Sequence, residues 1–434
     1  MWACATVIGL RSLAMMLVGS SVVVDADRDP EATVSVGPST IGERIKQLRL
    51  QRDPQMTQRE LAERAGVSVD LISKLEQGRK QTALLVSLHK IARALDVDAS
   101  MLLARPSRID VTDDGQDHGV LAIRRAITAV REDDEPAGVS ELEQSARYAW
   151  SAYWTNRFDV LGGLLPGFIG TARATAHATG APGVFAVLSD AYGVAASTLV
   201  HLGHVDLAYL AMDRATRAAD RSDDPLRRAA LSGWMSWLLL HQTGSSDQAR
   251  RLAVEEADRV EPRLAKARPD ELSVWGSLLV SGAVAAARED QPDEADDLLN
   301  LAEAVATRLQ AADHEVRTAF ERPFGLPLVV MQSVDVAVVT DRPGHALQVA
   351  KQMPPDAALP LAARARHLAD VANAQTSLGR DRAATDTLLA IERTAPHWIK
   401  YQAYPRTIVR ELLERERRAR TPQLRGLAHR LGVA

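Results

Sequence analysis

The chain of 434 residues lacks the motifs that typically build catalytic and metal sites. Its one cysteine, Cys4, excludes an internal disulfide and any zinc site made of several cysteines, and it suits a reducing cytoplasm. The sequence also lacks a glycine-rich phosphate loop, a nucleophile motif, and a paired acid and base at a defensible spacing. His201 and His204 lie three residues apart, but no third ligand follows at a clear spacing. We therefore expect no enzyme, no cofactor and no metal.

The first 24 residues form an apolar run that could be taken for a secretory signal or a membrane anchor. Arg11 is their single charge, and the 13 uncharged residues after it are short for a membrane span of ~20. The basic region is thin, and the sequence around Val24 makes a poor cleavage site. A signal, an anchor and an extension upstream of the true translation start are the three alternatives. We favour an extension at residues 1–38, and so predict a cytoplasmic protein without a membrane partner.

A net charge of −4 argues by itself against a nucleic-acid binder, but the charges are unevenly distributed. Residues 39–108 contain 13 Lys and Arg against 8 Asp and Glu, whereas residues 109–434 contain 37 against 44. A basic module on an acidic body is what local binding of phosphates requires. Because the excess is modest, we expect a dimer that places two modules on two half-sites.

The segment Met56–Gly78, MTQRELAERAGVSVDLISKLEQG, has the pattern of two short helices joined by a tight turn. Thr57 and Glu60 form a capping box that begins the first helix. Gly66 is expected to end it, because glycine reaches the left-handed conformation of a helix terminus at little cost. Ser68 is the candidate N-cap of the second helix. Such a pair of helices fits the major groove of DNA.

Three further helical patterns surround this pair. One follows a possible capping box of Thr40 and Glu43, the second has an apolar stripe from Leu84 to Leu95, and the third is a short helix at 98–103. Five short helices in about 65 residues make a complete small domain, which we place at residues 39–104.

The sequence here resembles the Cro/repressor-type (xenobiotic-response-element, XRE) helix-turn-helix regulators. The matching stretches are Gln58, Leu61–Ser68, Ile72–Gly78 and the closing LHKIARALDV. The resemblance implies an ion pair between Arg49 and Glu76. It assigns DNA contacts to Gln58, to Ser68, Val69, Asp70, Ser73 and Lys74 on the recognition helix, and to Arg79 and Lys80 at backbone phosphates.

The recognition helix departs from the best-studied members of that family. Val69 and Asp70 stand where amide side chains often bind adenine. Valine can only contact a thymine methyl group, aspartate can only accept, for instance from cytosine, and Lys74 can bind guanine. Asp70 has a second interpretation, because the helix dipole favours an acidic residue in the first turn. Both roles stay open, and the operator sequence does not follow.

Beyond a polar linker at residues 105–119, the rest of the chain (residues 120–434) is rich in alanine and leucine and has almost no strand pattern, although Leu326–Val339 could be mistaken for a strand. A signature recurs here: a loop with Gly or Asp, a polar residue, and a helix that opens with alanine. The opening alanines are Ala208, Ala249, Ala295, Ala346 and Ala383, with separations of 41, 46, 51 and 37 residues. These exceed the ~34 of a tetratricopeptide unit. The segment resembles the irregular tetratricopeptide-like (TPR-like) solenoids found after XRE modules in bacterial regulators, some of which bind signalling peptides.

The aromatic residues of this region either line a ligand groove or fill the core between repeats, and we favour the core. They are Trp150, Trp154, Tyr192, Trp234, Trp237 and Trp275.

The sequence thus predicts an all-α protein, with a five-helix DNA-binding domain followed by an irregular TPR-like α-solenoid. Its predicted function is sequence-specific transcriptional regulation, as a homodimer on double-stranded operator DNA. The helical repeats would sense a peptide, a small molecule or a protein. The alternative is a protein-interaction adaptor with nonspecific or no DNA binding.

Overall fold

The structure is a computed structural model that describes residues 41–52, 55–79, 85–95, 97, 102, 118–129, 134–242, 244–311, 324–354, 357, 359–415 and 422–433. Within these ranges every regular element is a helix, which confirms the predicted all-α class. The expected extension at 1–38, most of the short helix at 98–103 and most of the linker at 105–119 lie outside them.

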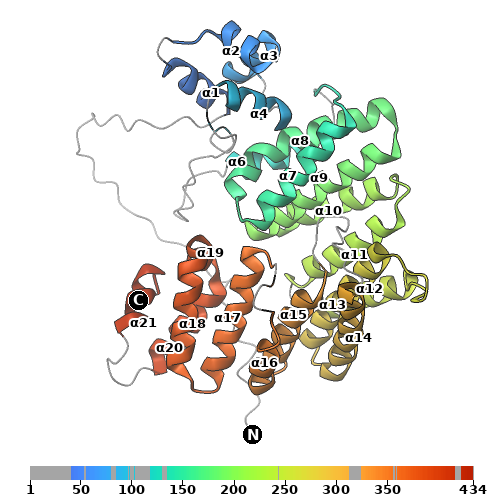
Figure 1. The fold of residues 1–434 in the computed structure, drawn as a ribbon, viewed down its shortest axis with the longest axis vertical. Helices are drawn as coiled ribbons and strands as arrows, with labels where there is room; N and C mark the ends of the chain where they lie inside the picture. The colour runs from blue at the N-terminus through green and yellow to red at the C-terminus, as the bar shows by residue number, and fades with distance from the viewer. Residues whose placement is uncertain are drawn as a thin grey trace, which may run out of the picture. The chain divides into compact units, whose positions relative to one another are not determined.

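The first helices along the chain form a small module (Figure 1), and their buried side chains belong to a larger apolar cluster that also includes residues of the following helices. One aliphatic side chain from each helix, Ile45, Leu61, Ile72 and Leu88, has no exposed surface. α1 packs against α3, and α2 packs against both α3 and α4. The helices are α1 (Ile41–Leu50), α2 (Gln58–Ala65), α3 (Val69–Glu76) and α4 (Leu85–Ala94).

The remaining described helices make up the region predicted as helical repeats. They are α6 (His118–Thr128), α7 (Val139–Trp154), α8 (Phe158–Thr179), α9 (Pro182–His201), α10 (Val205–Ala219), α11 (Pro225–Leu239), α12 (Ser246–Arg259), α13 (Pro269–Arg288), α14 (Pro292–Ala311), α15 (Leu326–Val339), α16 (Pro343–Ala350), α17 (Leu361–Ser377), α18 (Asp381–Thr394), α19 (Pro396–Tyr401), α20 (Ala403–Arg415) and α21 (Pro422–Arg430).

From α9 onward, consecutive helices pack in pairs: α9 with α10, α11 with α12, α13 with α14, α15 with α16, and α17 with α18. The fourth residue of each second helix is an alanine with no exposed surface, and such a small side chain lets the two helices approach closely. These alanines are Ala208, Ala249, Ala295, Ala346 and Ala384. The prediction of Ala383 was wrong by one residue. Because α18 begins at Asp381, Ala383 is only half-buried and Ala384 packs in the equivalent place.

The Gly or Asp of the repeat signature has a backbone role. After each first helix of a pair, and after α7, one residue adopts a left-handed conformation with φ between 55° and 80°. Glycine, asparagine and aspartate tolerate this region better than other residues, and it ends a helix sharply. The six residues are Asn156, Gly203, Gly244, Asp290, Asp341 and Gly379. The likeness to tetratricopeptide units stays a prediction.

Two strongly apolar stretches are helices packed within the protein. The valine-rich segment Leu326–Val339 is α15, not a strand. α9 is 20 residues long and apolar enough to cross a membrane, yet 89% of its most apolar window is buried inside the protein. Most of the aromatic side chains are also core: Trp150, Tyr192, Trp234 and Trp275 are at most 5% exposed.

Candidate nucleic-acid interface and ligand pocket

The turn between α2 and α3 follows from its sequence. Thr57 Oγ1 accepts from the amide of Glu60 at 3.2 Å, and Glu60 Oε2 accepts from the amide of Thr57 at 2.6 Å, so the predicted capping box is present. Gly66 ends α2 with φ 62° and ψ 41°. Ser68 then caps α3, its Oγ accepting from the amide of Leu71 at 3.2 Å. The segment therefore forms two separate helices.

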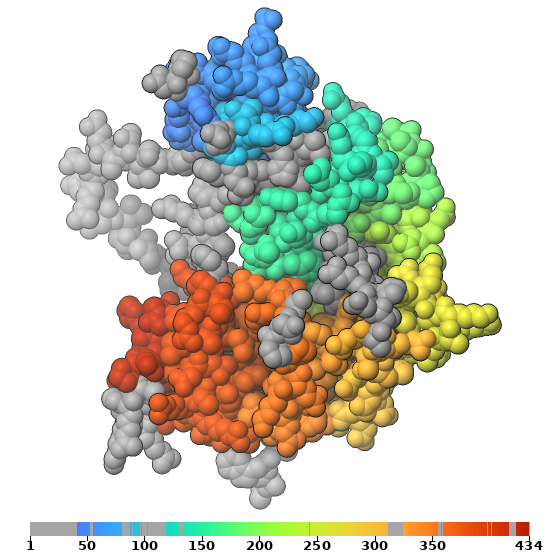
Figure 2. All heavy atoms as spheres, in the orientation of Figure 1, coloured from blue at the N-terminus to red at the C-terminus, as the bar shows by residue number. Residues whose placement is uncertain are grey.

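α3 buries one face and exposes the other. Ile72 and Leu75 have at most 1% of their surface exposed, whereas Val69 is 43% exposed. Ser68, Asp70 and Lys74 are also exposed, and Ser73 is half-buried. In the space-filling view the atoms of this module are the blue part of the molecular surface (Figure 2). The side chains assigned to DNA contact thus lie together on the solvent face of α3.

The two charges on this face pair with each other. Lys74 Nζ lies 2.7 Å from Asp70 Oδ2, one helical turn away. The hydrogen bond with Asp70 raises the pKa of the Lys74 ammonium above its ordinary value. Both side chains are well exposed, so water competes strongly for this pair. Lys74 therefore stays positive, and it can exchange Asp70 for an acceptor on DNA at little cost.

An ion pair beneath this face fixes α3 against α1. Arg49 donates from Nε and Nη2 to the two carboxylate oxygens of Glu76, each at 2.8 Å, and from Nη1 to the carbonyl of Met56 at 2.6 Å. The side chains are 9% and 2% exposed, and hydrogen bonding to Glu76 raises the pKa of Arg49. Gln58 joins them by donating from Nε2 to Glu76 at 2.7 Å. This bond orients the half-buried Gln58 at the first turn of α2.

Gly42 is a positioning residue that the sequence analysis missed. It is buried in α1, and a Cβ atom added there would lie 1.7 Å from the carbonyl oxygen of Leu75 in α3. Only glycine permits this approach of backbones. A glycine inside a helical pattern is unfavourable on propensity, and that was the signal available in the sequence.

Of the two residues expected at backbone phosphates, Arg79 is exposed just after α3 and Lys80 lies outside the described residues. Within the described ranges, no three His, Cys, Asp or Glu side chains group as a metal site.

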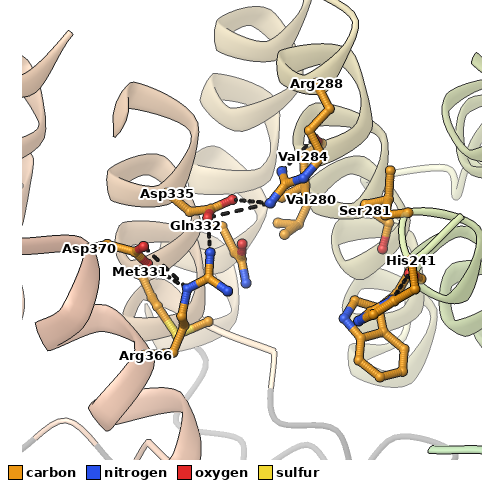
Figure 3. Close-up of a pocket in the computed structure, with 12 residues that line it drawn as sticks. His241, Val280, Ser281, Val284, Arg288, Met331, Gln332, Asp335, Arg366 and Asp370 are labelled. Carbon is orange, nitrogen blue, oxygen red and sulfur yellow. Dashed lines mark hydrogen bonds and ion pairs between the residues drawn. The ribbon is translucent and has the colours of Figure 1, made fainter. Parts of the chain in front are cut away.

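A second candidate site is a pocket between α11, α13, α15 and α17, with a volume of about 240 Å³ (Figure 3). Trp237, Val280 and Val284 supply apolar surface. Arg288 and Arg366 approach Asp335 from two sides, at 3.0 and 2.8 Å. The Nε of Arg366 also donates to both carboxylate oxygens of the next acid, Asp370, at 3.2 Å.

The pKa values of the two acids in this pocket are shifted in opposite directions. Burial alone would raise the pKa of Asp335, but the guanidinium groups of Arg288 and Arg366 outweigh burial and hold it below its usual range. Burial raises the pKa of Asp370 to about 7, with Arg366 opposing and Asp335 adding to the effect. Two guanidinium groups and an apolar wall suit a ligand that has an anionic group and an apolar body.

Sequence analysis did not single out these charged residues, although one signal was present. Asp335 is the only charged residue in α15, a helix that is otherwise apolar apart from Gln332 and Ser333. A charge in such a helix needs a partner. The partners come from α13 and α17, so sequence spacing could not identify them.

Comparison with known proteins agrees with the N-terminal geometry. Residues 40–104 match the family model of a helix-turn-helix domain. No curated protein and no solved structure matches the chain. The helix-turn-helix domain indicates a DNA-binding regulator.

Proposed function

We propose that this protein is a sequence-specific transcriptional regulator of the XRE type, which binds operator DNA as a homodimer in the cytoplasm. The observation that carries the proposal is the exposed face of α3, with its opposite face buried and α3 fixed to α1 by the Arg49–Glu76 ion pair. A rigid helix with small and polar side chains facing solvent is what major-groove binding requires. Enzymatic activity is no part of the proposal.

The proposed contacts follow from the chemistry of each side chain. Lys74 donates to guanine after leaving Asp70, Ser73 bonds a base edge or phosphate, and Val69 contacts a thymine methyl group. Asp70 either accepts from cytosine or stays with Lys74. Arg79 binds a backbone phosphate and adds affinity without sequence information.

The helical region is proposed to sense a ligand through the pocket of Figure 3. An anionic group entering there competes with Asp335 for Arg288 and Arg366, which join three helices. An exchange of ion-pair partners can shift these packed helices relative to one another and so transmit the effect of ligand binding. A typical coupling of ~1–3 kcal/mol would change operator affinity by about 5- to 150-fold.

Selection of bound fragments from a random DNA library tests the proposal, at one stated salt concentration because affinity depends steeply on salt. An enriched motif with twofold symmetry is expected. The double variant Lys74→Ala, Ser73→Ala should then lose ~1–3 kcal/mol or more on that motif. The control is Arg251→Ala, which changes an exposed arginine on α12, far along the chain.

Two outcomes would count against this function. If no motif is enriched, the adaptor alternative is favoured, in which the helical repeats bind a protein. If the double variant retains full affinity for an enriched motif, DNA binding stands but the recognition helix is misassigned.

A further inference from the structure

A second pocket lies between α8, α9 and α10, and it shares no residue with the pocket of Figure 3. α9 packs against both other helices. The pocket has a volume of about 230 Å³, close to that of the pocket of Figure 3. This space suits a small molecule rather than a peptide chain.

The walls of this pocket are cationic and its floor is apolar. α9 supplies the floor with Phe185, Leu188 and Tyr192, which are spaced by three and four residues and so share one face. Arg173 and His177 come from α8.

The opposite wall carries three arginines at spacings of three and four residues. Arg214 and Arg217 lie on α10, and Arg221 follows its end. None of the described residues that line the pocket is acidic. Such a concentration of positive charge contrasts with the acidic balance of residues 109–434.

Arg214 and Arg221 form no ion pair with a described residue. The Nε of Arg214 is buried, yet it donates no hydrogen bond to any described residue. The guanidinium of Arg221 lies 3.8 Å from the centre of the Phe185 ring, so its plane is placed by the aromatic floor. Arg217, in contrast, pairs with Asp213 at the exposed rim.

We propose that this pocket binds a small phosphorylated ligand with a flat apolar body, such as an aryl phosphate. Guanidinium groups bind phosphate oxygens in bidentate fashion, and several of them favour a dianion over a single carboxylate. The apolar face of α9 takes the ring, while Arg214 and Arg221 take the phosphate. This inference is independent of the proposed DNA binding, because none of its residues belongs to the helix-turn-helix.

Calorimetric titration of the full chain with phenyl phosphate tests the proposal at fixed ionic strength. Phenyl phosphate is expected to bind more tightly than inorganic phosphate, and phenol is expected not to bind. Arg214→Gln and Arg221→Gln should each weaken binding about tenfold or more, the loss typical of a charged hydrogen bond. Arg251→Gln, a change of an exposed arginine on α12, should leave the affinity unchanged.

The far-ultraviolet circular dichroism of each variant shows whether it folds. Arg221 is exposed, so its variant is expected to fold even if Arg214→Gln does not. The proposal is overturned if the wild-type chain does not bind phenyl phosphate, or if folded Arg221→Gln binds it as tightly as wild type. It is likewise overturned if the pocket variants weaken DNA binding while phenyl phosphate fails to bind, because the arginines would then contact the DNA backbone.

Discussion

Removing the carboxylate of Glu76 should loosen the recognition helix without touching its exposed face. In Glu76→Gln, the guanidinium of Arg49 stays buried, 9% exposed, without an opposite charge and without its bidentate acceptor. Breaking one side of a buried ion pair costs about 3–5 kcal/mol. The substituted amide keeps one neutral acceptor oxygen, for which Arg49 and Gln58 then compete. A small domain is stable by only ~5–15 kcal/mol, so this loss is a large fraction of the total.

Hydrogen exchange of the α3 amides is the suitable measurement, because a chain of this size need not unfold in one step. A loss of ~3 kcal/mol corresponds to about a hundredfold faster exchange through opening. Glu63→Gln is the matched control. It removes a carboxylate from the exposed Arg59–Glu63 pair of α2, where the expected change is at most ~1 kcal/mol.

Replacing both partners distinguishes the free-energy cost of an unpaired buried charge from the cost of the lost contact. Arg49→Met combined with Glu76→Leu removes the two charges together, and such replacements are often neutral. The double variant should therefore exchange more slowly than Glu76→Gln alone. The reasoning is refuted if Glu76→Gln and Glu63→Gln accelerate α3 exchange equally, or if the double variant is no better than the single one.

Two other predictions concern packing and pH. Gly42→Ala should shift α1 against α3. The free energy of opening α3, measured by hydrogen exchange, should fall by at least ~1–3 kcal/mol, and operator binding should weaken. The control is Gly344→Ala in α16, where an added Cβ meets no atom within 4 Å and the change should be neutral or slightly stabilising. Burial lowers the pKa of His367, which is 6% exposed, from 6.5 to about 4. The unfolded chain therefore takes up a proton before the folded chain does, and stability falls as pH drops from about 6.5 to about 4, by up to roughly 3 kcal/mol. Urea unfolding of α17 and α18, monitored by hydrogen exchange at several pH values, should show this loss of stability in the wild type. The dependence of stability on pH should be flatter in His367→Leu, and equal dependence in the two proteins would contradict the prediction.

The sequence by itself determined the local structure of this protein. Capping at Thr57, the left-handed Gly66 and the Ser68 cap depend on residues at most a few positions apart, so their pattern predicted the two helices and the turn. The buried alanines and left-handed loop residues were predictable for the same reason. Only the exact helix start decided between Ala383 and Ala384.

The tertiary structure alone decided which distant residues meet. No local rule joins Gly42 to Leu75, Asp335 to Arg288 and Arg366, or the arginine of α8 to those of α10. A charged residue in an apolar helix indicates that a partner exists, because burying a charge without one is costly. A glycine inside a helix likewise indicates that another part of the chain packs closely against it. Which residue becomes that partner depends on how helices far apart in the chain pack together, and helical periodicity carries no information about that.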